Sequence, residues 1–294
     1  MELPPLRVVL AASLALRLGI IALVDWLEVP GSHVAPTYTD IDYNVFTDAG
    51  ALFLSGASPY ERATFRYPPL LAWVGSLNHL VHRSAAKILF ALVDVAAGWI
   101  MHRILFLLAS NKCEDSNHFN SGRSTSFSSY EASSVISGRS KQSALFAIGY
   151  GWLFNPMVIN ISTRGSADTL PGALTVATIL GILTAVRNLQ QQQGLEANKL
   201  KQSQRNRTPR VEGQRETIVE SRCNVQLDAG WCWGCGLPLV LSGIAQGVAV
   251  HVKLYPVVHL PGLLYFLGPC LANARMAYPP LRRWLPSILT TEVK

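Results

Sequence analysis

Two aspartates separated by a single residue are the first groups in this chain that could do chemistry. Asp40 and Asp42 stand where apolar residues begin to recur with helical spacing, in residues 39–43. One carboxylate could act as a general base that takes a proton from a hydroxyl group, or both could hold a divalent cation. The alternative is structural, because Thr39 and Asp42 have the spacing of a helix capping box.

A stretch rich in proline, aromatic and basic residues follows at residues 58–70. An arginine there could clamp a phosphate group, and the aromatic faces could stack on a sugar ring. The same residues would also suit a rigid loop whose Tyr and Arg side chains anchor it among lipid headgroups. The candidate binding residues in this stretch are Tyr60, Arg62, Arg66 and Tyr67.

Two short polar turns carry the remaining candidates. Arg164 and Asp168 flank Gly165, and they could contribute to substrate binding or simply form a tight turn that caps the next helix. His251 and Lys253 come later in the chain. Lys253 could bind phosphate, or both side chains could extend from an apolar surface into the membrane interface.

Apolar segments must position these groups. Hydrophobic residues make up 49% of the 294 residues and charged residues only 15%, against about 25% charge in soluble domains. A helix needs about 17–25 mostly apolar residues to cross a bilayer, so we predict an all-α multi-pass membrane protein. Residues 68–81 are too short to cross and should form an interfacial helix. The predicted spans are residues 8–24, 88–110, 144–161, 170–186, 237–250 and 257–272.

The distribution of Lys and Arg predicts the orientation. With the N-terminus in the cytoplasm, 16 of these residues fall in cytoplasmic segments after the first span and 6 on the opposite face. The basic excess is therefore a topology signal, and we expect no nucleic-acid partner. Residues 111–142 and 188–230 are polar enough to be disordered cytoplasmic loops. Residues 28–84 form the lumenal loop that holds the aspartates, and residues 273–294 form a short cytoplasmic tail.

Polar residues inside the spans need a partner. Arg17 lies in the middle of the first span, where a charge costs several kcal/mol on most scales, so it should face the bundle interior, a cavity or a carboxylate such as Asp94. Cys232 and Cys235 have the spacing of a metal-binding pair, but a zinc site would need two further ligands. We interpret them as ordinary cysteines.

Several of these segments together resemble the catalytic subunits of glycosylphosphatidylinositol (GPI) mannosyltransferase I. Residues 38–49 are similar to the opening lumenal motif of that family, and residues 58–67 to its continuation. The resemblance covers roughly residues 5–272 outside the two polar loops. The chain stops sooner than members of that family, so we expect it to be C-terminally truncated relative to them. Later motifs follow in the same order at residues 155–156, 162–168 and 250–256.

The resemblance implies a GT-C-type, inverting glycosyltransferase of the endoplasmic reticulum membrane, with its active face in the lumen. Such an enzyme transfers mannose from dolichyl-phosphate-mannose to glucosaminyl-phosphatidylinositol through an α1,4 link, the first mannose of GPI-anchor biosynthesis. The family's Asp-x-Asp motif falls on Asp40 and Asp42, and we expect no metal or other cofactor. The resemblance also implies a small membrane subunit that stabilises the catalytic one within the lipid bilayer.

Two other functions fit the same sequence. The chain could be a non-catalytic multi-span subunit, such as the scaffold of GPI transamidase, in which case the aspartates would be dispensable. It could also be a transporter, because Arg17, Asp94 and Arg103 lie inside apolar segments.

Overall fold

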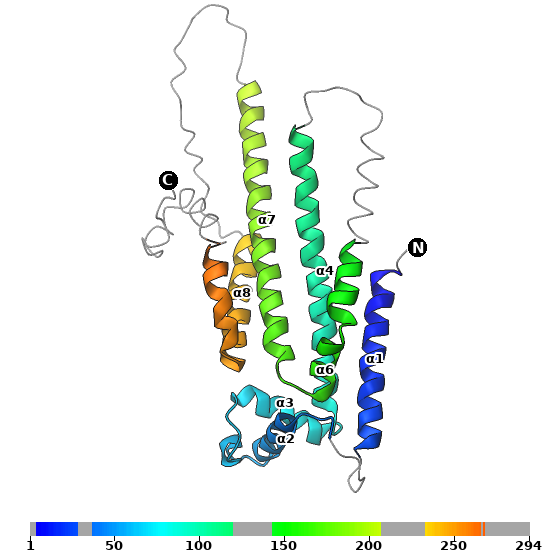
Figure 1. Cartoon of the computed structure of the whole chain (residues 1–294). Coiled ribbons are helices and arrows are strands. Elements are labelled where there is room, and N and C mark those ends of the chain that lie inside the picture. The colour runs from blue at the N-terminus through cyan, green and yellow to red at the C-terminus, as the bar shows by residue number, and fades with distance from the viewer. Residues whose placement is uncertain (1–3, 29–36, 120–142, 207–232, 266, 268–294) are drawn as a thin grey trace, which may run out of the picture. The chain divides into compact units, whose positions relative to one another are not determined.

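A computed structural model of the chain describes residues 4–28, 37–119, 143–206, 233–265 and 267. Within these ranges all regular structure is helical and there is no β-strand, which confirms the predicted all-α class (Figure 1). The chain divides into two compact units. The first comprises residues 1–180 with 242–257, and the second comprises residues 181–241 with 258–294. Every candidate site residue lies in the first unit.

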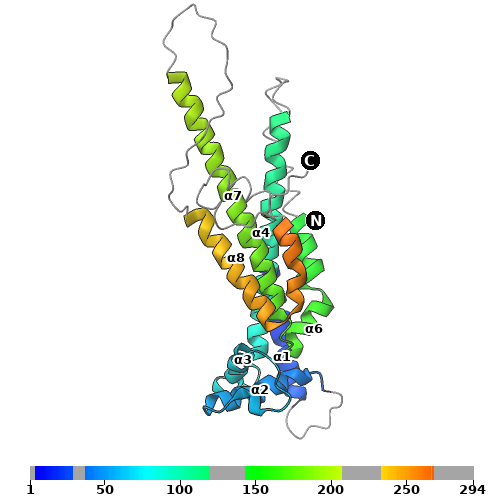
Figure 2. The same cartoon turned by 90° about the vertical axis from the view of Figure 1, so that its left-hand side faces the viewer.

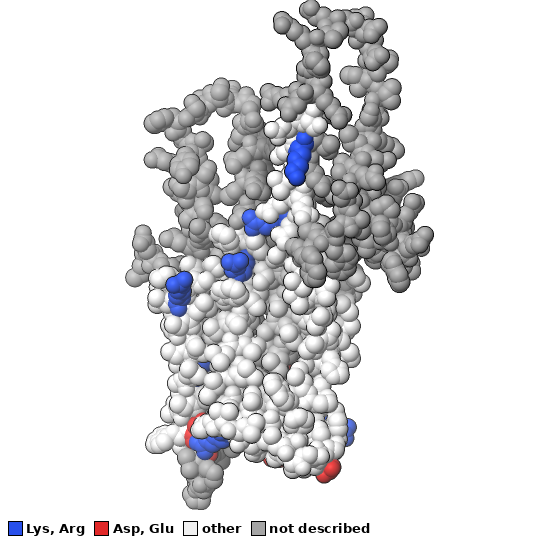
Figure 3. Space-filling view, turned by 180° about the vertical axis from the view of Figure 1, so that it is seen from behind, with Lys and Arg blue, Asp and Glu red and all other residues white. Residues whose placement is uncertain are grey.

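Among the described residues, three unbroken helices are long and apolar enough to cross a bilayer. They are α1 (Leu6–Leu27) and the first 24 residues of both α4 (Ala85–Phe119) and α7 (Thr169–Asn206). On the face shown in Figure 3, the middle zone carries few charged side chains, as expected for a surface in contact with lipid. The first, second and fourth predicted spans are thus confirmed as helices of sufficient length, and the molecule is a multi-pass membrane protein.

The third predicted span is broken. Its residues form two helical pieces, Ser143–Leu153 and α6 (Pro156–Arg164), which meet at an angle of 49°. Pro156 has no backbone N–H and keeps Asn155 out of the helical conformation, while the Asn155 side chain caps α6. The segment predicted as a span over residues 144–161 is therefore bent, because this local stop signal lies inside an apolar run; its crossing of the bilayer remains a prediction.

The fifth predicted span is helical, but short. It lies in α8 (Trp233–Val252), whose apolar part, Gly236–Val252, is shorter than the other candidate spans. Its crossing of the bilayer remains a prediction. The short helix η3 (Tyr255–His259) follows. Of the sixth predicted span, residues 257–265 and 267 are described. Its remaining residues (266 and 268–272), the tail at 273–294 and Cys232 lie outside the described residues.

Helices extend into both segments that were predicted to be disordered. α4 and α7 continue without a break through residues 111–119 and 188–206. Once a span has nucleated a helix, each added residue gains a hydrogen bond without a new nucleation cost, and the second segment is rich in Gln, Leu, Lys and Ala, which are good helix formers. The prediction was therefore wrong for these residues. Residues 120–142 and 207–230 lie outside the described ranges.

A buried ion pair connects the membrane helices of the first unit. Arg17 of α1 and Asp94 of α4 have side chains that are 0% and 2% exposed, and Arg17 Nη2 lies 2.6 Å from Asp94 Oδ2. Arg17 also donates to the carbonyl oxygen of Leu153, which ends the π-helical turn η2 (Gly149–Leu153), at 2.8 Å. Ser162 of α6 donates to Asp94 at 3.2 Å. Asp94 is thus the partner of Arg17, and the pair joins both pieces of the broken span to α1 and α4.

Two shorter helices, α2 (Ile41–Leu54) and α3 (Pro69–Leu80), pack on each other at one end of the first unit (Figures 1 and 2). Their backbones touch, because a Cβ atom at Gly50 would lie 2.4 Å from the backbone nitrogen of Ser76. The helix predicted over residues 68–81 is confirmed. We refer to this part of the first unit as the α2–α3 end.

Candidate functional site

The α2–α3 end carries the two candidate catalytic aspartates at the start of α2. Asp40 is the N-cap residue, and its side chain accepts a hydrogen bond from the backbone N–H of Asp42 at 3.4 Å. The predicted capping box with Thr39 is absent because the Thr39 hydroxyl donates to Glu28 instead. The Asp40 N–H donates to the carbonyl of Arg164 at 3.0 Å. The end of α6 therefore determines where α2 begins.

Asp42 is exposed, and its carboxylate accepts a hydrogen bond from the Tyr67 hydroxyl. Burial raises the pKa of Tyr67 well above its ordinary value, and the bond to Asp42 and the negative charges of Asp42, Asp40 and Asp168 raise this pKa further. The phenol consequently stays protonated at neutral pH and acts as a donor. These four side chains form the acidic part of the site.

A turn from a distant part of the sequence supplies the cation. Lys253, just after α8, forms an ion pair with Asp168, and the two side chains are 29% and 40% exposed. The Ser166 hydroxyl donates to the second oxygen of Asp168 at 3.2 Å. Burial and the charge of Asp168 raise the pKa of Tyr255. The turns after α6 and α8 thus meet beside the aspartates.

The turn after α6 has a defined shape. Arg164 Nε donates to the carbonyl of Tyr38 at 3.0 Å, and the hydroxyls of Tyr38 and Thr163 are 2.7 Å apart. Gly165 has φ +85°, a left-handed conformation that glycine adopts without a Cβ penalty. A Cβ there would also lie 2.3 Å from the ring of Tyr43. One role of Arg164 is thus structural, because its side chain fixes the backbone of Tyr38, two residues before Asp40.

The four remaining predicted binding residues are Tyr60, Arg62, Arg66 and His251. Arg62 pairs with Asp48 at 2.9 Å on the exposed surface. The ring of Tyr60 lies 5.5 Å from that of Phe65, which in turn packs against Tyr67. The described residues show no hydrogen bond or ion pair for the two exposed side chains Arg66 and His251. These side chains are free to meet a ligand.

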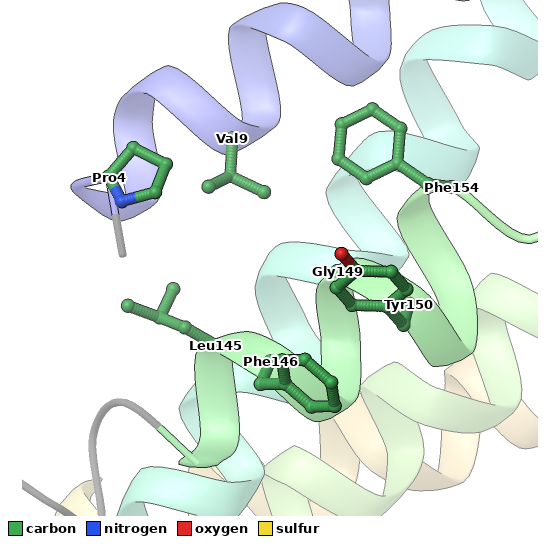
Figure 4. A pocket seen from close by; sticks show the side chains of 7 residues that line it. All are labelled: Pro4, Val9, Leu145, Phe146, Gly149, Tyr150 and Phe154. Atoms are coloured by element: carbon green, nitrogen blue, oxygen red, sulfur yellow. The ribbon is translucent and has the colours of Figure 1, made fainter. Parts of the chain in front are cut away.

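An apolar pocket lies at the opposite end of the first unit from α2 and α3. It has a volume of about 280 Å³ and is formed by Pro4 and Val9 at the start of α1 and by five residues between 145 and 154 (Figure 4). It contains none of the predicted site residues, so we give it no part in the chemistry.

Sequence reasoning missed several polar residues around the aspartates. Glu28 follows α1, Lys87 lies in the first turn of α4, and Tyr255 lies in η3. Glu28 and Lys87 could have been found from the sequence, because each is a charged residue at the boundary of an apolar span. Over the described ranges, no group of three or more His, Cys, Asp or Glu side chains could hold a metal ion. The expectation of a metal-free site remains a prediction.

The apolar helices and the charged cluster at one end define the chain as a multi-pass membrane protein with a polar site beside its spans. A family model described as "GPI transamidase subunit PIG-U" matches residues 11–289. The chain belongs to this family.

Individual relatives carry a different description. The chain is 36% identical over 265 residues to "GPI mannosyltransferase 1" of Emericella nidulans, covering 89% of this chain and 42% of that protein. It is 38% identical to the Aspergillus fumigatus protein of the same name, over 60% of this chain and 35% of the relative. It is 35% identical to "GPI alpha-1,4-mannosyltransferase I, catalytic subunit" of Danio rerio, over 49% of this chain and 29% of that protein. The chain thus spans about two fifths or less of these relatives, and the resemblance seen in the sequence is confirmed.

Proposed function

We propose that this chain is the catalytic part of a GPI mannosyltransferase of the endoplasmic reticulum membrane, with the α2–α3 end in the lumen. It would transfer mannose from dolichyl-phosphate-mannose to glucosaminyl-phosphatidylinositol. The names of the relatives support the reaction. The observation that carries the proposal is the meeting of Asp40, Asp42 and Lys253 at one end of a set of membrane helices.

The reaction would be a single displacement at the anomeric carbon of mannose. A carboxylate takes the proton from the acceptor hydroxyl, and the hydroxyl oxygen forms a bond to that carbon. The bond from this carbon to the phosphate oxygen breaks, and dolichyl phosphate leaves with the electron pair. The donor link is β and the product link is α, so the configuration inverts. Both substrates are lipids, which explains why the site must lie beside membrane spans.

Asp40 and Asp42 are the two candidates for the base. Asp42 is held by the Tyr67 hydroxyl, and Asp40 is held as the helix N-cap, so each carboxylate has a defined position. Positioning of this kind contributes strongly to catalysis, because the reacting groups must be aligned before the bond forms.

The leaving phosphate needs a cation to neutralise its charge. Arg62 is paired with Asp48 and Lys253 with Asp168, while Arg164 holds the carbonyl of Tyr38. Arg66 is the arginine of this set for which the described residues provide no partner, so we assign it the first contact with phosphate. Lys253 would join it by exchanging Asp168 for the phosphate. Tyr60, Tyr67 and His251 would contact the sugars.

A second candidate function comes from the family model. A subunit of GPI transamidase would also be a multi-span membrane protein, but its role in that complex would not require a proton acceptor at Asp40 or Asp42. For the mannosyltransferase we propose, in addition, a small membrane subunit that stabilises the chain.

The test is mannose transfer in microsomes from cells that lack the first GPI mannosyltransferase. Two proteins are compared: this chain, and a chimera in which it replaces the matching 265-residue region of the Emericella nidulans relative. We expect radiolabelled mannose to be transferred to glucosaminyl-phosphatidylinositol by the chimera. Asp40→Asn or Asp42→Asn, whichever removes the base, should lower this rate by about 100-fold or more.

The control variant is Asp48→Asn, which breaks only an exposed ion pair and should keep most of the activity. If the chimera and both of its Asp variants transfer mannose equally, the proposed chemistry is wrong. If cells with a disrupted copy of this chain instead accumulate the completed, unattached GPI lipid, the transamidase function is correct.

A further inference from the structure

Thr39, the residue before Asp40, is held by two membrane helices. Glu28, the C-cap residue directly after α1, accepts hydrogen bonds from the Thr39 hydroxyl and from the backbone N–H groups of Thr39 and Tyr38. Lys87, in the first turn of α4, donates from Nζ to the same hydroxyl at 2.7 Å. The Thr39 hydroxyl therefore accepts from Lys87 and donates to Glu28.

The burial of Lys87 shows that this arrangement is specific. Its side chain is 2% exposed, and a buried ammonium group is costly unless it is paired and hydrogen-bonded. The ammonium finds the Thr39 hydroxyl on one side and the ring of Tyr43 on the other, with Nζ 5.1 Å from the ring centroid. Burial raises the pKa of Glu28, but the bonds from Thr39 and Tyr38 and the charge of Lys87 outweigh it and keep this pKa below its ordinary value.

The engagement of Thr39 also decides which residue begins α2. Thr39 and Asp42 have capping-box spacing, so a free Thr39 hydroxyl would compete for the N-cap position. With this hydroxyl directed toward Glu28, Asp40 becomes the N-cap, and its N–H reaches the carbonyl of Arg164. A start one residue earlier would move Asp40 from the extended N-cap position into the first helical turn, and its side chain would lose the bond from the Asp42 N–H.

We propose that Glu28, Thr39 and Lys87 form a clamp that positions Asp40 and Asp42 for the transfer reaction. This inference rests on the proposed function. None of the three residues is assigned a contact with substrate, so they are positioning residues. The clamp connects the ends of two bilayer-spanning helices to the start of α2, and it thereby sets the carboxylates relative to the membrane surface where lipid-linked sugars arrive.

The test compares Thr39→Val with Thr39→Ser in the form of the protein that transfers mannose. Valine has the shape of threonine without its hydroxyl, and serine keeps the hydroxyl. We expect Thr39→Val to lower kcat about 10-fold or more, since small misplacements of reacting groups are costly. KM for both lipids should stay within about twofold and Thr39→Ser should restore kcat to within about threefold, because substrate contacts and the hydroxyl are kept.

Two further variants keep the test decisive. Thr175→Val removes another buried threonine hydroxyl, which bonds only within α7, and it should leave kcat unchanged. Glu28→Gln preserves shape but removes the charge opposite Lys87, and it should lower kcat in the same way as Thr39→Val. If Thr39→Val and Glu28→Gln both keep wild-type kcat while the Asp variants lose activity, the clamp is wrong and the proposed function stands. If the Asp variants also keep full activity, the proposed function itself fails.

Discussion

Arg17 Nη2 lies 2.6 Å from Asp94 Oδ2, and both side chains are almost completely buried within helices that cross the bilayer. Besides neutralising each other's charge, the two side chains bond to the broken span. Through Leu153 and Ser162 the pair contacts both sides of the break at Asn155, so it holds the bend that brings the end of α6 to Asp40.

Removal of one partner of the Arg17–Asp94 ion pair should destabilise the protein more than removal of both partners. Arg17→Met leaves the Asp94 carboxylate buried without its cation, which we expect to cost about 3–5 kcal/mol, whereas Arg17→Met with Asp94→Leu should recover part of this loss. The measurement is thermal unfolding in detergent, followed by tryptophan fluorescence. A double variant that unfolds at a lower temperature than Arg17→Met would show that the other bonds of Asp94, and not its charge, are what matters.

The turn after α6 should not tolerate a side chain at Gly165. Gly165→Ala forces a left-handed conformation that costs about 1–2 kcal/mol in L-residues, and the added Cβ would collide with the ring of Tyr43. Gly172→Ala is the matched control, since it lies in α7 with no atom within 4 Å of the new Cβ; it should stabilise the helix by up to about 1 kcal/mol. Equal effects of both changes on the unfolding temperature would contradict the described turn.

Tyr67 should make the protein sensitive to alkaline pH. Its pKa is raised above the ordinary value of 10.0 in the folded state by burial and by the carboxylates of Asp42, Asp40 and Asp168. A raised pKa means that the folded state holds the proton more tightly, so this contribution to stability is complete below about pH 10 and is lost progressively as the pH rises toward the folded pKa.

The measurement is the unfolding temperature between about pH 8 and pH 11, a range that covers the onset of this loss. Tyr67→Phe should show a smaller fall above pH 10 than the wild type. Tyr150→Phe serves as the control, because that hydroxyl lies in the pocket at the opposite end of the unit, and it should leave the fall unchanged. If the unfolding temperature of Tyr67→Phe falls above pH 10 as much as that of the wild type, then Tyr43 and Tyr255, whose pKa values are raised as well, account for the whole fall.

The spans could be predicted from sequence because the requirement for crossing a bilayer is local. Each of α1, α4 and α7 carries a sufficient apolar run in its own residues. The need for a partner at Arg17 also follows from local chemistry, since a charge in an apolar segment must be compensated wherever the chain goes. The local stop signal at Asn155 and Pro156 was present too, but the apolar run around it concealed the break.

Only the tertiary structure decided what the polar side chains at the α2–α3 end do. Local spacing made Thr39 a helix cap, yet Glu28 and Lys87, brought from two different spans, engage its hydroxyl and leave that role to Asp40. The pairing of Lys253 with Asp168 likewise joins turns that are far apart in the chain. A hydrogen bond depends on distances that folding sets, and residue order alone does not contain those distances.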